Sequence, residues 1–208
     1  VFARNVLPHV KNIHSILEGI EILMDEYSIG IIEFHEAGLI LKDLHYDSIY
    51  HEHLFYFSLK TMSQLLEKHH LHVFDIMAST ISGGSWVIYF SKTRNSKTDF
   101  LKQVEKLESE SDINNIKSWK TFANRAEEHA KKLRSMVSGK DKILAYGASA
   151  RSSTLLNFCG INSDTVSAII DKNPLKQGLN TPGSDIPIIS FEQGLEKIKS
   201  EDRIFLLA

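Results

Sequence analysis

Apolar residues near the start of the chain recur with a helical period and then give way to a short apolar run. Six of them lie at helical spacing: Ile13, Ile16, Leu17, Ile20, Leu23 and Met24. This spacing predicts an amphipathic helix with one apolar face. The sequence "SIG" ends the helix, and "IGIIEF" at residues 29–34 is typical of a buried strand. A helix followed by a buried strand is half of a parallel α/β unit.

The pattern up to residue 92 predicts a second helix and a β-hairpin. Ser58 can cap a helix whose apolar face carries Leu59, Met62, Leu65 and Leu66. Two β-rich runs follow, "HVFDIMAST" and "SWVIYFSK", and Ser82-Gly83-Gly84 between them suits a hairpin turn. We therefore expect residues 1–92 to form a parallel sheet closed by a hairpin.

The rest of the chain predicts a helical link and a second parallel sheet. Residues 93–139 are charged, with apolar residues at roughly helical spacing, and should form one or two helices. From Lys142 onwards, strand-like and helix-like runs alternate: "KILAYGAS", "ARSSTLLNFCG", "VSAIIDKN", "IPIIS", "FEQGLEKIK" and "RIFLLA". Such alternation predicts a small parallel sheet. The expected fold class is α/β, with domains at 1–92, 93–139 and 140–208.

Composition narrows the classes of function. The net charge of −2 gives no basic footprint for nucleic acid. No run reaches the roughly 18 apolar residues of a membrane span. The single cysteine, Cys159, excludes a disulfide within the chain and a cysteine-based zinc site built by this segment alone. These features favour a cytoplasmic protein, and they leave the oligomeric state open.

The sequence "YGASARSS" at residues 146–153 is a first candidate site. Gly147 lies at a strand-to-helix turn that suits an anion, and Arg151 adds positive charge. Asp171 follows the next predicted strand, where Rossmann domains carry a ribose-binding acid. One glycine is not the G-x-G-x-x-G motif, however. The segment is therefore either a nucleotide or phosphate site, or a tight turn beside a surface acid.

The sequence "YDSIYHEH" at residues 46–53 is a second candidate. In a strand His51 and His53 would share a face, and two such histidines can bind a metal, although the spacing is not that of a zinc helix. As an acid–base centre, His53 could be the base and Tyr50 could stabilise an oxyanion, with Glu52 orienting a histidine. A polar packed turn without catalytic function is the third interpretation.

Two further polar residues follow the first predicted strand end. Asn5 and His9, in "RNVLPHV", directly precede the first helix. In parallel sheets, ligands bind beyond the carboxyl ends of the strands. The pattern alone therefore predicts no more than an acid–base cluster near the carboxyl edge of an α/β sheet.

Several long motifs carry a family resemblance. They occur in this order: "ARNVLPHV", "GIIEF", "YDSIYHEHLFYFSLKTMSQLLEKH", a Gly-Gly-Ser hairpin, "AYGASAR", "STLLNFCGI" and "IDKNPLKQGLNTPG". Together they resemble the sugar C-methyltransferases, which act on nucleotide-linked 4-keto-deoxysugars. The resemblance covers nearly the whole chain.

The resemblance implies a longer protein. A full family member has an N-terminal zinc-binding segment, a Rossmann-like S-adenosylmethionine (SAM) domain and a C-terminal α/β domain. This chain would begin late in the SAM domain and stop within the last domain. The start at Val1 and the apolar end "RIFLLA" agree with a fragment. The zinc site and most of the SAM site would then lie outside the chain, which is expected to be inactive alone.

The resemblance also implies roles for particular residues. His53 would remove the proton from sugar carbon 3, and the enolate would attack the methyl group of SAM. Tyr50 and Glu52 would hold the substrate or stabilise the enolate. The implied sugar and nucleotide contacts are Asn5, His9, Gly147, Ser149 and Arg151. Convergence of Tyr50, Glu52 and His53 on one sugar predicts an irregular turn or a first helical turn rather than a strand.

Some positions depart from the family pattern. Family members tend to have glycine at Ser152 and at His70, so we expect crowding at the first and a left-handed conformation at the second. The family hairpin often reads His-Gly-Gly-Ser-Leu-Arg, where this chain has Ser82-Gly83-Gly84-Ser85-Trp86-Val87. These changes predict a different sugar or altered activity. The alternative function is a non-catalytic module that binds a nucleotide or nucleotide sugar at Gly147–Arg151.

Overall fold

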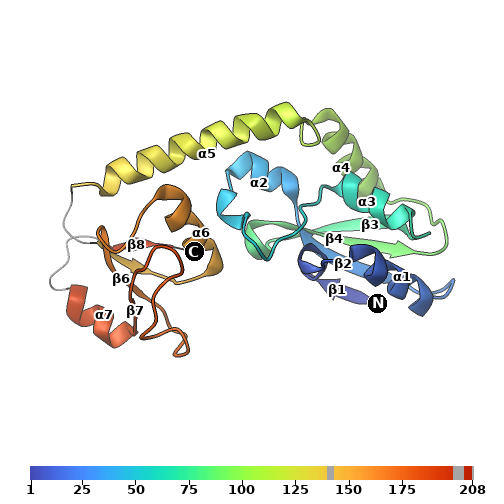
Figure 1. Cartoon of the computed structure of the whole chain (residues 1–208). Coiled ribbons are helices and arrows are strands. Elements are labelled where there is room, and N and C mark those ends of the chain that lie inside the picture. The colour runs from blue at the N-terminus through green and yellow to red at the C-terminus, as the bar shows by residue number, and fades with distance from the viewer. Residues whose placement is uncertain (140–142, 199–203, 208) are drawn as a thin grey trace. The chain divides into compact units, whose positions relative to one another are not determined.

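The computed structural model describes residues 1–139, 143–198 and 204–207 (Figure 1). Its chain contacts define two compact units. The first contains residues 1–45 and 51–122, and the second contains residues 46–50 and 123–208. The division into 1–92, 93–139 and 140–208 stays a prediction. The predicted element ends at Lys142, Lys199, Arg203 and Ala208 lie outside the described residues.

The first unit is built on a four-stranded sheet in the order β1-β2-β4-β3. β1 (Phe2–Arg4) and β2 (Gly30–His35) are parallel and are joined through α1 (Ile13–Leu23). β3 (His72–Ser79) and β4 (Ser85–Ser91) form an antiparallel hairpin, and β4 inserts beside β2. The predicted parallel pair closed by a hairpin is therefore confirmed.

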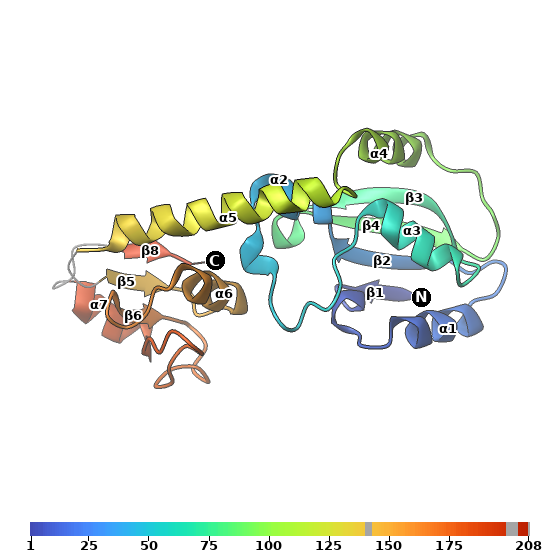
Figure 2. The same ribbon diagram turned by 45° about the horizontal axis from the view of Figure 1, so that its top comes forward.

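One face of this sheet forms the core of the first unit. Ile32 and Phe34 of β2 and Ile88 and Phe90 of β4 are fully buried, and apolar residues of three helices pack against them. The helices are α1, α3 (Leu59–Glu67) and α4 (Asp99–Glu110), whose ribbons lie beside the sheet in Figure 2. The predicted cap of α3 is confirmed, because the Ser58 side chain accepts from a backbone N–H of the first turn.

Short helices follow the carboxyl ends of β1 and β2. η1 (Leu7–His9) follows β1, and α2 (Ala37–Asp43) follows β2. The carboxylate of Glu36 caps α2 by accepting two backbone N–H groups, each at 2.7 Å. Leu44, with φ of 60°, ends α2 in the left-handed conformation and leads to η2 (Tyr46–Ser48). The two connections bring polar residues to the edge of the sheet where ligands bind in α/β folds.

The second unit contains the predicted parallel sheet, with strand order β7-β6-β5-β8. Its elements after α5 (Ile116–Val137) are β5 (Ile143–Tyr146), α6 (Ala150–Cys159), β6 (Val166–Ile170), β7 (Ile188–Ile189), α7 (Phe191–Ile198) and β8 (Ile204–Leu206). The predicted helical link consists of α4 and α5. No helix in the part of the chain that the structure describes is long and apolar enough to cross a membrane.

Candidate functional site

Tyr50, Glu52 and His53 lie in an irregular turn and not in a strand. η2 ends at Ser48, residues 50–52 form a bend and turn, and residues 53–56 have no regular secondary structure. The expected irregular turn is therefore confirmed. The alternating faces of a strand do not apply to these side chains.

A short helix holds the backbone on the C-terminal side of this turn. The Leu54 N–H donates to the Pro8 carbonyl oxygen at 2.8 Å, and His9 Nδ1 lies 2.9 Å from the Glu52 carbonyl oxygen. A carbonyl oxygen only accepts hydrogen bonds, so His9 Nδ1 must carry a proton. Nε2 is then the unprotonated ring nitrogen of neutral His9. η1 thus positions the turn and presents one histidine in a defined tautomer.

His53, the proposed base, is half-buried between two aromatic rings. The ring centroids of His9 and His53 are 4.8 Å apart, with planes tilted by 59°. Tyr56 approaches His53 edge-on, at a centroid distance of 6.1 Å. Contacts with both rings restrict the orientations of the imidazole. Of the predicted site residues, the structure thus brings His9, His53 and the backbone of Glu52 together.

The side chains of Glu52, Tyr50 and Asn5 are placed less directly. The Glu52 carboxylate is 61% exposed and lies 4.0 Å from Nε2 of His51. Tyr50 is half-buried at the end of the segment 46–50. Asn5 follows β1 with φ of 50°, and its N–H donates to the Glu33 carbonyl oxygen at 2.9 Å. Their contact with a sugar stays a prediction.

A metal at His51 and His53 finds no support from additional ligands. The His51 side chain is 88% exposed. Among residues 1–139, 143–198 and 204–207, no group of three or more His, Cys, Asp or Glu side chains is arranged to hold a metal ion.

The N-terminal side of the turn is anchored by Tyr46 on the second unit. Tyr46 is 6% exposed, and its hydroxyl lies 2.8 Å from Nδ1 of His129 on α5 and 3.5 Å from Sγ of Cys159 on α6. Its ring packs on Phe158 at 4.8 Å. Burial raises the pKa of Tyr46 far above its ordinary value and also raises the pKa of the Cys159 thiol. Tyr46 is therefore a neutral structural anchor, a role that no sequence motif indicated.

Asp47 adds an ion pair to this anchor. Its Oδ2 accepts from Nε of Arg151 at 2.7 Å, and the two side chains are 21% and 29% exposed. Arg151 was expected to add positive charge at an anion site, but its Nε is engaged by a carboxylate of the same unit. The pair joins residues 104 positions apart, so no local pattern could have indicated it.

The turn after β5 requires glycine. Gly147 has φ of 94°, and a β-carbon there would lie 2.3 Å from the Leu207 carbonyl oxygen. The Gly147 N–H donates to Ile170 at 2.8 Å, and the Leu207 N–H donates to Tyr146 at 2.9 Å. Close approach of neighbouring strands therefore explains this glycine.

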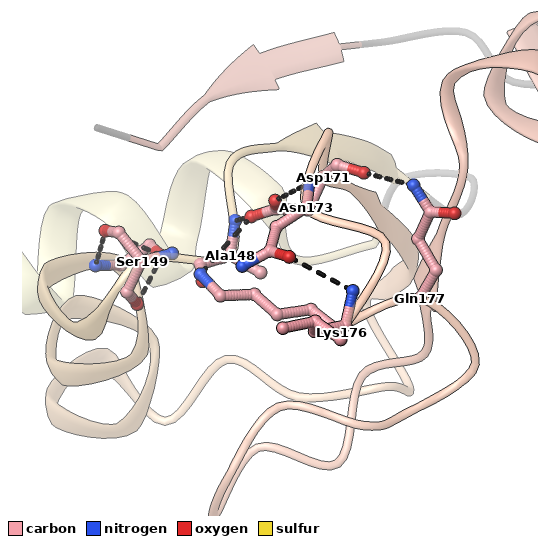
Figure 3. A network of polar contacts seen from close by, with 8 residues as sticks. Ala148, Ser149, Asp171, Asn173, Lys176 and Gln177 are labelled. Carbon is pink, nitrogen blue, oxygen red and sulfur yellow. Dashed lines mark hydrogen bonds and ion pairs between the residues drawn. The ribbon is translucent and has the colours of Figure 1, made fainter.

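Asp171 holds the same turn from the end of β6 (Figure 3). Its two carboxylate oxygens accept from the backbone N–H groups of Ala148 and Asn173, each at 2.8 Å. Lys176 donates to the Ala148 carbonyl oxygen at 2.6 Å and lies 3.6 Å from Asp171, while Gln177 donates to the Asp171 carbonyl oxygen. Partial burial raises the pKa of Asp171, but the two N–H groups and Lys176 outweigh it and the pKa is lowered. Its position resembles that of a ribose-binding acid, but its contacts stabilise the turn after β5.

Two departures from the family pattern are accommodated locally. Ser152 is buried and completes a capping box on α6: the Ser149 hydroxyl accepts from its N–H at 3.0 Å, and its own hydroxyl accepts from the Ser149 N–H at 2.7 Å. The side chain expected to crowd the helix start therefore stabilises it. His70 has φ of 57°, which confirms the left-handed conformation expected where relatives have glycine.

The altered hairpin residues pack into the first unit. Trp86 meets Phe100 edge-on with ring centroids 6.4 Å apart, and Val87 is 8% exposed. Both side chains are therefore structural in this chain. A different sugar or altered activity, which the change from the family hairpin predicted, stays a prediction.

Comparison with known proteins identifies the class. A family model described as the C-methyltransferase C-terminal domain matches residues 80–208. C-methyltransferase NovU of Streptomyces niveus is 31% identical over an alignment of 203 residues, and the alignment covers 93% of this chain and 47% of that protein. The chain belongs to the C-methyltransferase family. It spans about half the length of this curated relative.

Proposed function

We propose that the full-length protein is a SAM-dependent methyltransferase acting on carbon 3 of a nucleotide-linked 4-keto-6-deoxysugar. Family membership supports methyl transfer to carbon. The sugar substrate rests on the motif resemblance. The observation that carries the proposal is the placement of His53, held between His9 and Tyr56 beyond the carboxyl end of β1.

The chemistry suits a neutral histidine base. A hydrogen on carbon 3 is acidic because the adjacent ketone delocalises the carbanion as an enolate. His53 takes that proton, and the electron pair of the broken C–H bond moves into the enolate, whose oxygen accepts from the Tyr50 hydroxyl. Bound SAM would supply a methyl group on positively charged sulfur: carbon 3 would form the new C–C bond with its electron pair, while the methyl C–S bond breaks and the neutral thioether leaves. Glu52 accepts from a sugar hydroxyl.

The remaining predicted residues bind the rest of the substrate. Asn5 and His9 line the sugar, and the unprotonated Nε2 of His9 suits a sugar hydroxyl donor. Gly147 and Ser149 contact the nucleotide from the start of α6. For Arg151 this role stays a prediction, because its Nε already pairs with Asp47.

By the motif resemblance, the SAM site and the zinc site lie in other parts of the full-length protein, and the 208-residue chain alone is expected to be inactive. A cytoplasmic location is supported by the one cysteine, which is buried and carries no disulfide.

Deuterium exchange separates the base from the other residues. The full-length protein would be incubated with the keto-sugar nucleotide in heavy water, with and without SAM, and the products analysed by NMR and mass spectrometry. We expect His53→Asn to abolish both exchange at carbon 3 and methylation. His51→Asn is the matched control, since it makes the same change in the same turn at a side chain that is 88% exposed.

Two outcomes would contradict the proposal. Normal exchange in His53→Asn would remove His53 as the base. Absence of exchange and methylation in the wild-type full-length protein would remove the proposed substrate. If His51→Asn and His53→Asn lost activity equally and added metal restored it, a metal site would replace the acid–base interpretation.

A further inference from the structure

We propose that His9 is a positioning residue for His53, which acts by holding the peptide group that directly precedes the base. The role belongs to Nδ1 of His9 and is separate from the sugar contact assigned above to its Nε2. The inference rests on the function proposed above, because it takes His53 as the base. All residues that carry it lie in the first unit.

Both peptide groups that flank His53 are held by consecutive residues of η1. Nδ1 of His9 donates to the Glu52 carbonyl oxygen at 2.9 Å, and the Leu54 N–H donates to the Pro8 carbonyl oxygen at 2.8 Å. We call these two hydrogen bonds the η1 clamp. A residue has two soft backbone dihedrals, φ and ψ, and each turns about a bond next to one planar peptide group. The η1 clamp therefore restricts φ and ψ of His53, and with them the direction of its Cα–Cβ bond.

η1 itself is firmly held. Leu7 is fully buried in the core of the first unit, and Pro8 is also buried. The pyrrolidine ring fixes φ of Pro8, and the His9 N–H donates to the Val6 carbonyl oxygen at 3.0 Å. Of the two bonds in the η1 clamp, only that of His9 is made by a side chain. A substitution at His9 can therefore remove one bond of the clamp and leave the other in place.

The His9 ring also packs against His53, at a centroid distance of 4.8 Å. A ring contact lets the two side chains slide past one another, whereas a hydrogen bond is directional and sets the distance between two atoms. We therefore assign the positioning to Nδ1 and not to the ring. His9 and Glu52 are exposed, so water can replace this hydrogen bond and its loss should leave the fold intact.

The position of the base affects the rate of proton abstraction. A general base must lie about 3 Å from the atom whose proton it takes, and a misplacement of about 1 Å can reduce a rate by roughly 100-fold. The Pro8 bond remains when His9 is replaced, so part of the η1 clamp survives. Loss of the His9 bond should therefore lower kcat for proton abstraction by about 10-fold.

Three substitutions of His9 in the full-length protein test the assignment. Asparagine carries an amide N–H close to the position of Nδ1, phenylalanine keeps a ring without a donor, and alanine removes both. Deuterium exchange at carbon 3 would give kcat and KM for each variant. We expect His9→Phe and His9→Ala to lower kcat by about 10-fold, and His9→Asn to stay within about threefold of wild type. All three remove Nε2, so KM should rise by a similar factor in each.

His72→Ala is the matched control. Nδ1 of His72 lies 2.7 Å from the Glu67 carboxylate, and His72 pairs with Ser91 at the opposite end of the sheet from the carboxyl end of β2. The variant thus removes a hydrogen-bonded histidine of the same unit far from η1, and kcat should not change. Circular dichroism would confirm that each variant folds, and the comparison of His9→Asn with His9→Phe does not depend on the alanine variant.

Amide hydrogen exchange gives a readout that needs no substrate. The Leu54 N–H should exchange faster in His9→Phe and His9→Ala than in wild type, because a looser turn opens its bond to Pro8 more often. His9→Asn should keep most of the protection. Equal protection of Leu54 in wild type and His9→Phe would overturn the inference.

The kinetic outcomes separate positioning from a sugar contact. Wild-type kcat in His9→Phe would show that ring packing suffices, and equal losses of kcat in His9→Asn and His9→Ala would show that the Nδ1 donor is not what matters. A raised KM with unchanged kcat in all three variants would leave His9 with the sugar contact alone. Each of these results would overturn the inference. Absence of carbon 3 exchange in the wild type would instead contradict the proposed function, while amide exchange would still test the η1 clamp.

Discussion

Replacement of Asp171 by asparagine should destabilise the second unit through the turn that follows β5. The carboxylate accepts two backbone N–H groups at 2.8 Å and lies 3.6 Å from Lys176, and its side chain is 14% exposed. Hydrogen bonds to a charged group contribute about 1.5 to 3 kcal/mol each. Asparagine keeps one carbonyl acceptor and turns an N–H donor toward the other backbone N–H, so one bond is lost. We expect a loss of about 2 kcal/mol in the free energy of unfolding.

The pH dependence of this effect has a definite sign. The pKa of Asp171 is lowered in the folded state, so the ionised carboxylate stabilises the fold. Its contribution is fully present above the unfolded pKa, about 3.9, and is lost as pH falls through the lower folded pKa. The difference between wild type and Asp171→Asn should therefore be constant near neutral pH and shrink as the solution is acidified below about pH 4.

Urea unfolding followed by far-ultraviolet circular dichroism would measure the difference, with amide hydrogen exchange locating it in β5 and β6. Both tryptophans, Trp86 and Trp119, lie in the first unit, so their fluorescence reports that unit alone. Asp164→Asn is the matched control, because Asp164 is an exposed acid in the second unit. Equal stabilities of wild type and Asp171→Asn at neutral pH, or a difference that persists at acid pH, would refute the structural role.

Two other stability predictions concern the same region. Gly147→Ala should lower the free energy of unfolding by at least about 2 kcal/mol more than Gly178→Ala. Both residues have positive φ, but only at Gly147 would a β-carbon meet a backbone oxygen. Equal melting temperatures of the two variants would show that the clash is relieved. Ser152→Gly should lower the free energy of unfolding by about 1 kcal/mol more than Ser153→Gly, because only Ser152 closes the capping box of α6. Urea midpoints compare the two variants, and a smaller loss of stability for Ser152→Gly would contradict the capping role.

Local pattern was sufficient for most elements of this fold. The apolar period of residues 13–24, the cap at Ser58 and the glycines between the hairpin strands each report on neighbours within a few positions. The alternation after residue 142 predicted the parallel order of the second sheet for the same reason. These features depend on backbone geometry and on one buried face, which a sequence displays directly.

The sequence by itself determined the family, the α/β class, and the segment where acid–base residues gather. Only the tertiary structure placed Tyr46 and Asp47 on α5 and α6, put His9 beside His53, and showed that the two oxygens of Asp171 hold a turn. Apart from the bond between Asp171 and Asn173, each of these contacts joins residues at least 23 positions apart. Packing, and not local preference, selects such partners. Before the chain folds, many side chains of suitable charge or polarity could pair with each of these residues.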